Sequence, residues 1–212
     1  MTAKKLPEGL HIDTLAVRAA VDKSQYGENS EALFLTSSFT QPDSETAARR
    51  FSGLEDGYIY SRFTNPTNAS MEQRLAALEG AEACISTSSG MSAVLLLCMG
   101  LLKAGDHVVC SQSVFGSTLK LIGSEFAKFG VQSTFVPQTD VAAWQAAVQP
   151  NTKLLFAETP TNPLTEVCDI RASAWVLTSW CIRAPSTSTA RVAWWPAPCV
   201  PARNWSRKSS SR

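Results

Sequence analysis

The chain has no closely spaced cysteine pair, no long uninterrupted hydrophobic run and no acidic residue in its last 40 positions. Its six cysteines stand singly, which argues against a zinc site or a redox pair and favours reduced, buried thiols. The longest apolar stretch, Ala93 to Leu102, is interrupted by glycine and is too short to span a bilayer. No signal-peptide pattern follows Met1. We therefore expect no metal site, no membrane partner and a cytoplasmic protein.

The charged residues are unevenly distributed. Residues 1–172 contain 13 Lys and Arg against 18 Asp and Glu, whereas residues 173–212 contain 6 against none. A basic segment can bind nucleic acid, but these charges lie scattered among Trp, Pro and Ser without a run or a helical stripe. We therefore expect no nucleic-acid partner.

From Asn65 onward, helix-like and strand-like segments alternate. A helix capped by Asn68 and stopped at Gly80 is followed by predicted strands at 83–87, 106–110, 131–136 and 153–158, and by predicted helices at 91–102, 118–129 and 141–148. The helix at 91–102 is apolar on nearly all sides, so we expect it to be buried. This alternation predicts an α/β fold with a mostly parallel sheet, right-handed connections and helices on both faces.

The two ends of the chain differ from this pattern. Residues 1–59 have little periodicity and are interrupted by Gly and Pro, so we expect an N-terminal arm of the kind that wraps over a neighbouring subunit. Residues 60–172 form the predicted main domain. Residues 173–212 show no periodicity that survives four prolines, and they do not resemble a domain.

A candidate anion site lies where the strand at 83–87 meets the helix at 91–102. The amides of Ser89, Gly90 and Met91 would open that helix, where unpaired N–H groups and the positive end of the dipole favour a phosphate. Upstream, Arg62 offers a forked donor suited to phosphate and Tyr60 a hydroxyl. Taken singly, each has a plainer interpretation: an ordinary turn, a surface ion pair and a packing residue.

Four motifs in order give a more specific interpretation. They are Tyr60–Thr67 (YSRFTNPT), Ser88–Met91 (SSGM), Ser113–Thr118 (SVFGST) and Glu158–Pro163 (ETPTNP). Together they resemble the Cys/Met-metabolism family of pyridoxal-phosphate (PLP) enzymes, over about residues 8–172 and roughly the first two-fifths of a family member. The resemblance implies the large domain of PLP fold type I (aspartate-aminotransferase-like), present incompletely.

The resemblance also implies roles for individual residues. Ser89, Gly90 and Met91 would hold the phosphate of PLP, while Tyr60 and Arg62 would reach it from a partner subunit of a homo-oligomer, a dimer of dimers in the family. Phe115 would stack on the pyridine ring where most members have Tyr, and Asn162 would hydrogen-bond the 3-oxygen. Glu158 would help to fix its loop. As isolated residues, Phe115 is also typical of a core position, and Glu158 and Asn162 of turns before proline.

Several family features are missing from these residues. The Asp that pairs with the pyridine nitrogen, the Ser-x-Thr-Lys motif of the Schiff-base lysine and the C-terminal domain have no counterpart, so we predict no catalytic residue. The tail offers an explanation. A permitted codon set for Ser173 to Cys199, read two bases later, encodes RLGADLVVHSGTKYLDGQGRVVAGAL, which resembles the family's lysine segment. We therefore expect a deletion and frame change after about residue 172 and a poorly ordered tail; a lineage-specific tail is the alternative.

By resemblance, the expected function belongs to methionine biosynthesis and transsulfuration. Phe115 in place of Tyr favours O-succinylhomoserine sulfhydrylase, in which an amino-acid substrate exchanges its γ-acyloxy group for sulfide to give homocysteine. Cystathionine γ-synthase and methionine γ-lyase are the alternatives within the enzyme class. A non-catalytic fragment is the alternative outside it, because the Schiff-base lysine is absent.

Overall fold

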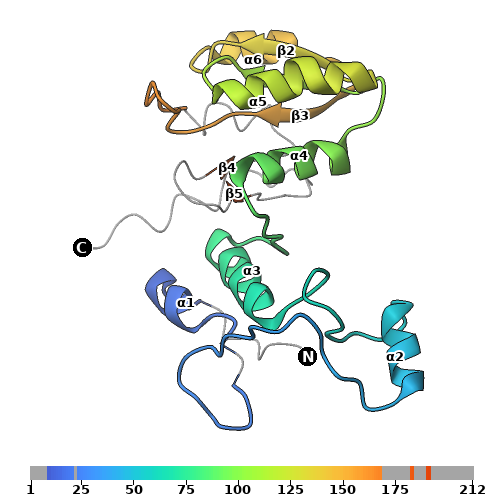
Figure 1. The fold of residues 1–212 in the computed structure, drawn as a ribbon. Helices are drawn as coiled ribbons and strands as arrows, with labels where there is room; N and C mark the ends of the chain where they lie inside the picture. Colours follow the sequence, from blue (N-terminus) through green and yellow to red (C-terminus); the bar gives the residue numbers. More distant parts are fainter. Residues whose placement is uncertain (1–8, 22, 169–181, 184–189, 192–212) are drawn as a thin grey trace. The chain divides into compact units, whose positions relative to one another are not determined.

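The computed structural model describes residues 9–21, 23–168, 182–183 and 190–191. The chain divides into two compact units, Met1–Thr87 and Ser88–Arg212. The first unit contains three helices and the second contains the sheet (Figure 1). The boundary lies just before the helix that was predicted to begin at Met91.

The first unit is built from α1 (Ile12–Arg18), α2 (Ser44–Phe51) and α3 (Pro66–Glu79). The predicted helix before Gly80 is confirmed as α3, which ends there in the left-handed conformation at φ 65°. Its cap, however, is Asn65 and not Asn68. The Asn65 carboxamide oxygen accepts from the Thr67 amide at 2.8 Å, and Pro66 occupies the first helical position, where a missing N–H costs nothing.

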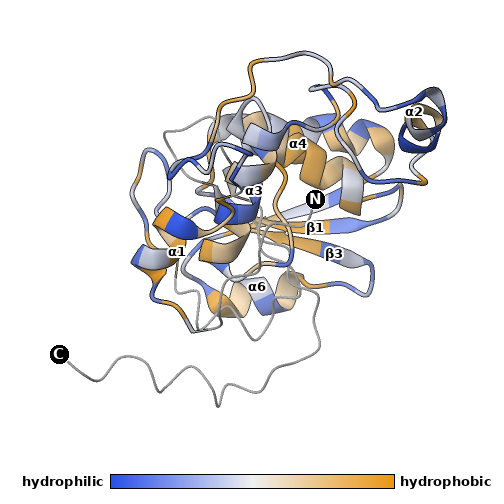
Figure 2. Ribbon diagram, turned by 90° about the horizontal axis from the view of Figure 1, so that it is seen from below, coloured by the Kyte–Doolittle hydropathy of each residue, from blue (hydrophilic) through white to orange (hydrophobic). Residues whose placement is uncertain are grey.

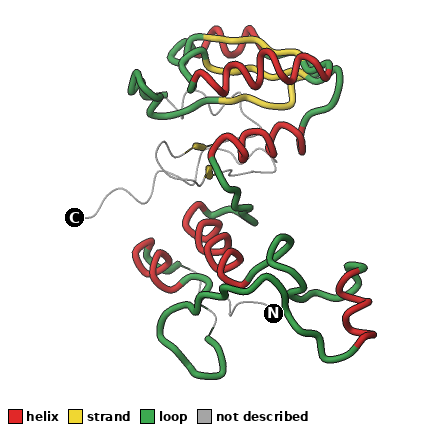
Figure 3. The backbone as a smooth tube through the Cα atoms, in the orientation of Figure 1, coloured by secondary structure: helices red, strands yellow, loops and turns green. Residues whose placement is uncertain are grey.

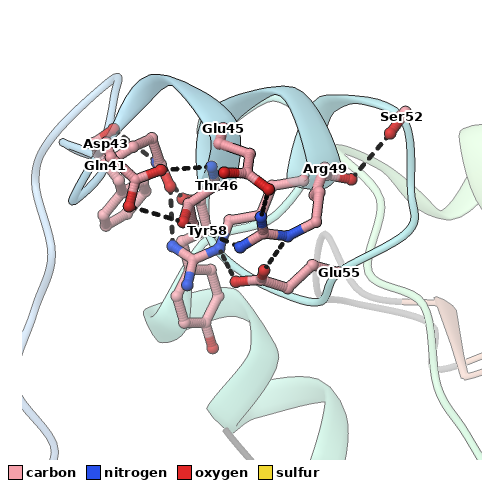
Figure 4. Close-up of polar contacts among 10 residues, drawn as sticks. Gln41, Asp43, Glu45, Thr46, Arg49, Ser52, Glu55 and Tyr58 are labelled. Atoms are coloured by element: carbon pink, nitrogen blue, oxygen red, sulfur yellow. Dashed lines mark hydrogen bonds and ion pairs between the residues drawn. The ribbon is translucent and has the colours of Figure 1, made fainter.

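A network of charged side chains holds the segment around α2 (Figure 4). The Glu55 carboxylate accepts from Arg49 Nε at 2.9 Å and from Arg50 Nε at 3.0 Å, and the hydrogen bond from Arg49 is the main reason that the pKa of Glu55 is lowered. Arg50 also donates to Gln41 Oε1 at 2.7 Å. Gly57 leaves room for the side chain of Arg50, which a Cβ at position 57 would overlap.

The second unit contains a parallel three-stranded sheet in the order β2–β1–β3. In this sheet Val109 of β1 stands opposite Thr134 of β2 and Leu155 of β3. The predicted parallel α/β arrangement is therefore confirmed. The elements are α4 (Gly90–Leu101), β1 (His107–Ser111), α5 (Gly116–Lys120), a π turn η1 (Leu121–Glu125), a 3₁₀ turn η2 (Phe126–Phe129), β2 (Gln132–Val136), α6 (Val141–Ala147) and β3 (Thr152–Phe156).

Helices cover both faces of the sheet, as predicted. Alternate strand residues point to opposite faces, and the middle of β1 and the C-terminal part of β3 are hydrophobic (Figure 2). On one face, Val108, Cys110, Leu154 and Phe156 pack with residues of α4, η1 and η2. On the other face, Val109, Val136 and Leu155 pack with Trp144 of α6.

The strand predicted at 83–87 does not form. This segment is drawn as a loop between α3 and α4 (Figure 3), and Ile85 is 64% exposed. The Ser86 amide and hydroxyl both donate to a carboxylate oxygen of Glu72 at 2.7 Å, so the local polar groups are satisfied by a side chain and not by a neighbouring strand. An apolar stretch becomes a strand only where another strand pairs with it.

Two predicted helices differ in detail. The helix predicted at 91–102 forms as α4 but is buried on one side only, since Leu95, Leu96 and Met99 are 41%, 47% and 67% exposed. The helix predicted at 118–129 forms as three successive helical types, α5, η1 and η2. Within η1, Gly123 lies against the ring of Phe135, and a Cβ there would be 3.0 Å from it.

The predicted frame-shifted tail, residues 173–212, lies almost wholly outside the described residues. Two short strands within it are described, β4 (Ile182–Arg183) and β5 (Ala190–Arg191), which pair antiparallel.

Two core cysteines should be unreactive in the native protein. Cys98 and Cys110 are fully buried, and burial raises the pKa of Cys98 to about 12 and that of Cys110 as well. Because the thiolate is the reactive form, a thiol reagent at pH 8 should leave both unlabelled, whereas the half-buried Cys84, whose pKa burial also raises, should react faster than either of them. Mass spectrometry of peptides from protein labelled with and without urea measures the extent of labelling at each cysteine. Native labelling of Cys98 as fast as Cys84 would contradict the described core.

Candidate functional site

The candidate site lies at the carboxyl edge of the sheet, where the loops after β1, β2 and β3 meet. In a parallel sheet all strands end at the same edge, which is where ligands of α/β proteins bind. Three polar residues follow or end these strands: Ser111, Gln138 and Glu158. They are 0%, 2% and 1% exposed, so their polar groups must be satisfied inside the protein.

Hydrogen bonds connect these three residues across the sheet. The Ser111 hydroxyl donates to Gln138 Oε1 at 2.8 Å. The Gln138 Nε2 donates to the carbonyl oxygens of Glu158 at 3.0 Å and Glu166 at 3.2 Å. The loops after all three strands are therefore joined by buried side-chain contacts.

Phe115 stands between β1 and α5 and is half-buried. Its amide donates to Glu158 Oε2 at 2.9 Å, which ties the loop after β1 to the end of β3. The other carboxylate oxygen, Oε1, is buried and has no hydrogen-bond partner among the described residues. A buried acceptor of this kind is rare in folded proteins and fits a donor that the described part of the chain does not supply.

At the N-terminus of α4, the amides of Gly90 and Met91 have no acceptor within the helix itself. Ser89 is the N-cap, and its hydroxyl accepts from the Ser92 amide at 3.1 Å, while its carbonyl accepts from Ala93 at 3.1 Å. Among the described residues, nothing accepts from the amides of Gly90 and Met91. Both lie at the positive end of a 12-residue helix, which is the arrangement that binds phosphate groups.

The α4 terminus lies beside the first turn of α5. The Thr118 hydroxyl donates to Met91 Sδ at 3.7 Å, and Thr118 follows Phe115 by three residues. The structure therefore connects the α4 N-terminus to the loop that carries Phe115, and that loop to Glu158.

Asn162 lies in a closed loop after β3 and is half-buried. The Thr161 amide donates to the carbonyl of Glu166 at 3.0 Å, and the Thr161 hydroxyl accepts from the Glu166 amide at 2.9 Å. The Cys168 amide donates to the Thr159 hydroxyl at 3.0 Å. The bonds before Pro160 and Pro163 are both cis.

Tyr60 and Arg62 belong to the first unit, whereas the other predicted site residues belong to the second. The Arg62 guanidinium lies 5.2 Å from the ring centroid of Tyr60 and 5.3 Å from that of Phe63. Cation–π contacts of this kind limit the conformations of an exposed arginine. In the first unit, Arg62 therefore lies close to two aromatic rings. In the second unit, side-chain contacts link the start of α4 to the helix that follows Phe115, and link the Phe115 loop to the loop that contains Asn162.

Sequence reasoning missed Ser111 and Gln138. The signal was present, since each is a polar residue at or just after the end of a hydrophobic strand. Neither belongs to the motifs that carried the resemblance, so nothing in the pattern separated them from ordinary loop residues.

A family model described as Cys/Met metabolism PLP-dependent enzyme matches residues 13–180. The chain belongs to this family. An O-succinylhomoserine sulfhydrylase of Pseudomonas aeruginosa is 53% identical over 167 residues, which are 79% of this chain and 41% of the relative. An L-methionine gamma-lyase of Treponema denticola is 39% identical over 172 residues, 81% of this chain and 43% of the relative.

A solved structure supports the same family fold. It is a putative O-acetylhomoserine (thiol)-lyase of Campylobacter jejuni with N'-pyridoxyl-lysine-5'-monophosphate, which matches with a TM-score of 0.74 and 28% identity over 83% of this chain and 44% of its own. The predicted PLP type I fold is confirmed, as a partial domain. This Cys/Met-family chain spans about two-fifths of the length of the curated relatives it matches.

The donor set of this Cys/Met-family chain fits PLP, the cofactor of its family. Two amides in the first turn of a helix suit a phosphate, a half-buried aromatic ring suits stacking, and a carboxamide suits the ring oxygen. The described residues contain no group of three or more His, Cys, Asp and Glu arranged to hold a metal ion. No helix in the described part of the chain is long and apolar enough to cross a membrane.

Proposed function

We propose that this chain supplies the phosphate and ring contacts of a PLP-dependent sulfhydrylase that acts on O-succinylhomoserine. The observation that carries the proposal is the N-terminus of α4, with the first-turn amides of Gly90 and Met91 beside the helix that follows Phe115. The greater identity to the P. aeruginosa sulfhydrylase than to the T. denticola methionine gamma-lyase supports this branch. A γ-lyase activity is the second candidate.

Each proposed contact has a physical basis in the second unit. The amides of Gly90 and Met91 hold the phosphate by charge-assisted hydrogen bonds, and Ser89 orients them by capping the helix. Phe115 holds one face of the pyridine ring and excludes water from it. Asn162 donates to the ring oxygen from a loop that Thr161 and Glu166 close.

The first unit contributes Arg62 and Tyr60. We propose that they bind the phosphate of a neighbouring copy in a homo-oligomer, where the guanidinium supplies a second charge for the same anion. PLP, when bound, supplies the electron sink for exchange at the γ-carbon of an amino-acid substrate. The family's Schiff-base lysine motif is not among the 212 residues. We therefore propose that this chain binds the cofactor but does not turn over substrate.

The α4 amides can be tested with a matched pair of substitutions at Gly90. Proline at the first helical position is tolerated, and Ser89 already has the extended backbone that a following proline requires, at φ −159° and ψ 159°. Gly90→Pro removes the amide donor, whereas Gly90→Ala adds a Cβ and keeps it. The pair therefore separates loss of the donor from crowding.

We expect Gly90→Pro to weaken binding of pyridoxine 5′-phosphate about tenfold more than Gly90→Ala does, since a hydrogen bond to a charged group contributes about 1.5–3 kcal/mol. Isothermal titration calorimetry with the full chain measures the two affinities, and pyridoxine without phosphate is the control ligand. Equal losses in the two variants would assign the effect to crowding and reject the amide contact. An absence of binding by the unmodified chain would reject the proposed function.

A further inference from the structure

Gln138 occupies an unusual position for a polar side chain. It follows β2, is 2% exposed, and lies between the loop that carries Phe115 and the loop that carries Asn162. Its amide orientation is fixed by its neighbours, because two carbonyl oxygens surround Nε2 and a hydroxyl faces Oε1. Gln138 therefore donates to one loop and accepts from the other.

The accepting side of Gln138 leads to the loop after β1. The Ser111 hydroxyl donates to Gln138 Oε1, and the same hydroxyl accepts from the Ser113 amide at 3.0 Å. Because the hydroxyl donates one hydrogen bond and accepts another, its orientation is fixed. The position of Ser113, at the start of the Phe115 loop, is thus coupled through one hydroxyl to the Gln138 carboxamide.

The donating side of Gln138 leads to the loop after β3. Nε2 holds the backbone carbonyl of Glu158, and the side chain of this same residue accepts from the Phe115 amide at 2.9 Å. A second bond from Nε2 reaches the Glu166 carbonyl, which also accepts from the Thr161 amide beside Asn162. The Gln138 carboxamide therefore contacts both loops, in addition to the direct bond from the Phe115 amide to Glu158 Oε2.

The backbone of Gln138 has an anchor that its side chain does not provide. Trp144 of α6 is buried, and its Nε1 donates to the backbone carbonyl of Gln138 at 3.3 Å. A substitution of the side chain can therefore release the two loops while the chain path after β2 is kept. A side-chain substitution at position 138 can therefore show whether Gln138 positions the loops or only stabilises the core.

We propose that Gln138 is a positioning residue for the cofactor ring: it sets the distance between Phe115 and Asn162 by linking their loops. Its consequence for the ring rests on the proposed function, whereas the linkage between the loops rests on the hydrogen bonds alone. Only a side chain that donates and accepts at once can make both links. Glutamate at this position has no donor for the two carbonyls, and methionine has the length but neither group.

The linkage is tested in the full chain by amide hydrogen exchange of Ser113 and Phe115, followed by NMR. Gln138→Glu and Gln138→Met are compared with Gln145→Glu, which makes the same exchange of carboxamide for carboxylate at an exposed position on α6. We expect exchange of both amides to become at least fivefold faster in the Gln138 variants and to change less than twofold in Gln145→Glu. Unchanged exchange in both Gln138 variants would overturn the proposal.

The effect of Gln138 on binding of the cofactor ring is tested by ligand affinity, with pyridoxine 5′-phosphate and inorganic phosphate as probes. We expect both Gln138 variants to bind pyridoxine 5′-phosphate roughly tenfold more weakly and inorganic phosphate with less than a twofold change, because the α4 amides are not part of the linkage. Equal losses for both probes, or loss of far-UV circular dichroism in both variants, would overturn a positioning role and make Gln138 a stability residue. If the unmodified chain binds neither probe, the proposed function fails and the exchange rates still decide the linkage.

Discussion

Replacing Phe156 by alanine is expected to lower the free energy of unfolding of the second unit by about 3 to 5 kcal/mol, the range for deletion of a buried aromatic ring. Phe156 is 1% exposed and ends β3 within the cluster that joins the sheet to α4. Removal of the ring would leave a cavity in this cluster, and the cavity adds to the loss of buried apolar surface. Urea denaturation followed by circular dichroism, with exchange of the Val108 and Val109 amides, measures the loss.

The matched control is Phe129→Ala in the same unit. Phe129 is 70% exposed, and its ring meets that of Phe126 edge-on, with 6.3 Å between the centroids. Its removal should cost less than about 1.5 kcal/mol. If the two variants were equally destabilised, the sheet would not be the stable core of this unit.

No lysine of the 212-residue chain should be trapped stoichiometrically by PLP and borohydride. A Schiff-base lysine must be held at the cofactor and partly desolvated so that its amine is reactive. Lys103, Lys120, Lys128 and Lys153, the described lysines of the second unit, are all exposed. We therefore expect adducts well below one per chain, spread over several lysines, and no homocysteine from O-succinylhomoserine and sulfide.

Peptide mass spectrometry after reduction and digestion measures the site and the amount of adduct. The C. jejuni protein, whose solved structure contains N'-pyridoxyl-lysine-5'-monophosphate, is the positive control. One adduct per chain at a single lysine, together with turnover, would contradict the proposal that these residues bind the cofactor without catalysing the reaction.

The sequence predicted the elements of the second unit well, because hydrophobic periodicity is a local property. The strands at 106–110, 131–136 and 153–158 and the helix at 141–148 all form within one or two residues of their predicted ends. The segment at 83–87 was predicted as a strand for the same reason, and this prediction was wrong. Its apolar residues satisfy the pattern, but a strand requires a neighbour, and pairing is not encoded in the segment itself.

The candidate site was accessible to sequence reasoning only through its motifs. Ser89, Gly90, Met91, Phe115 and Asn162 stand in motifs, and their roles remain predictions. The contacts of Gln138 join residues that are 27, 20 and 28 positions apart, and no spacing rule connects them. The sequence likewise shows two aromatic residues near Arg62. That the Arg62 guanidinium lies against the rings of Tyr60 and Phe63 depends on the backbone path, which the sequence does not show.

The order β2–β1–β3 has a consequence for how the protein behaves at high concentration. Within the described residues, β2 and β3 each pair on one side only, so each offers a row of backbone donors and acceptors to a strand from another molecule. The two edges are not equivalent. Lys153 places an exposed charge on β3, which discourages such pairing, whereas the sequence of β2, QSTFV, contains no charge. Growth of the sheet from molecule to molecule is therefore favoured along β2.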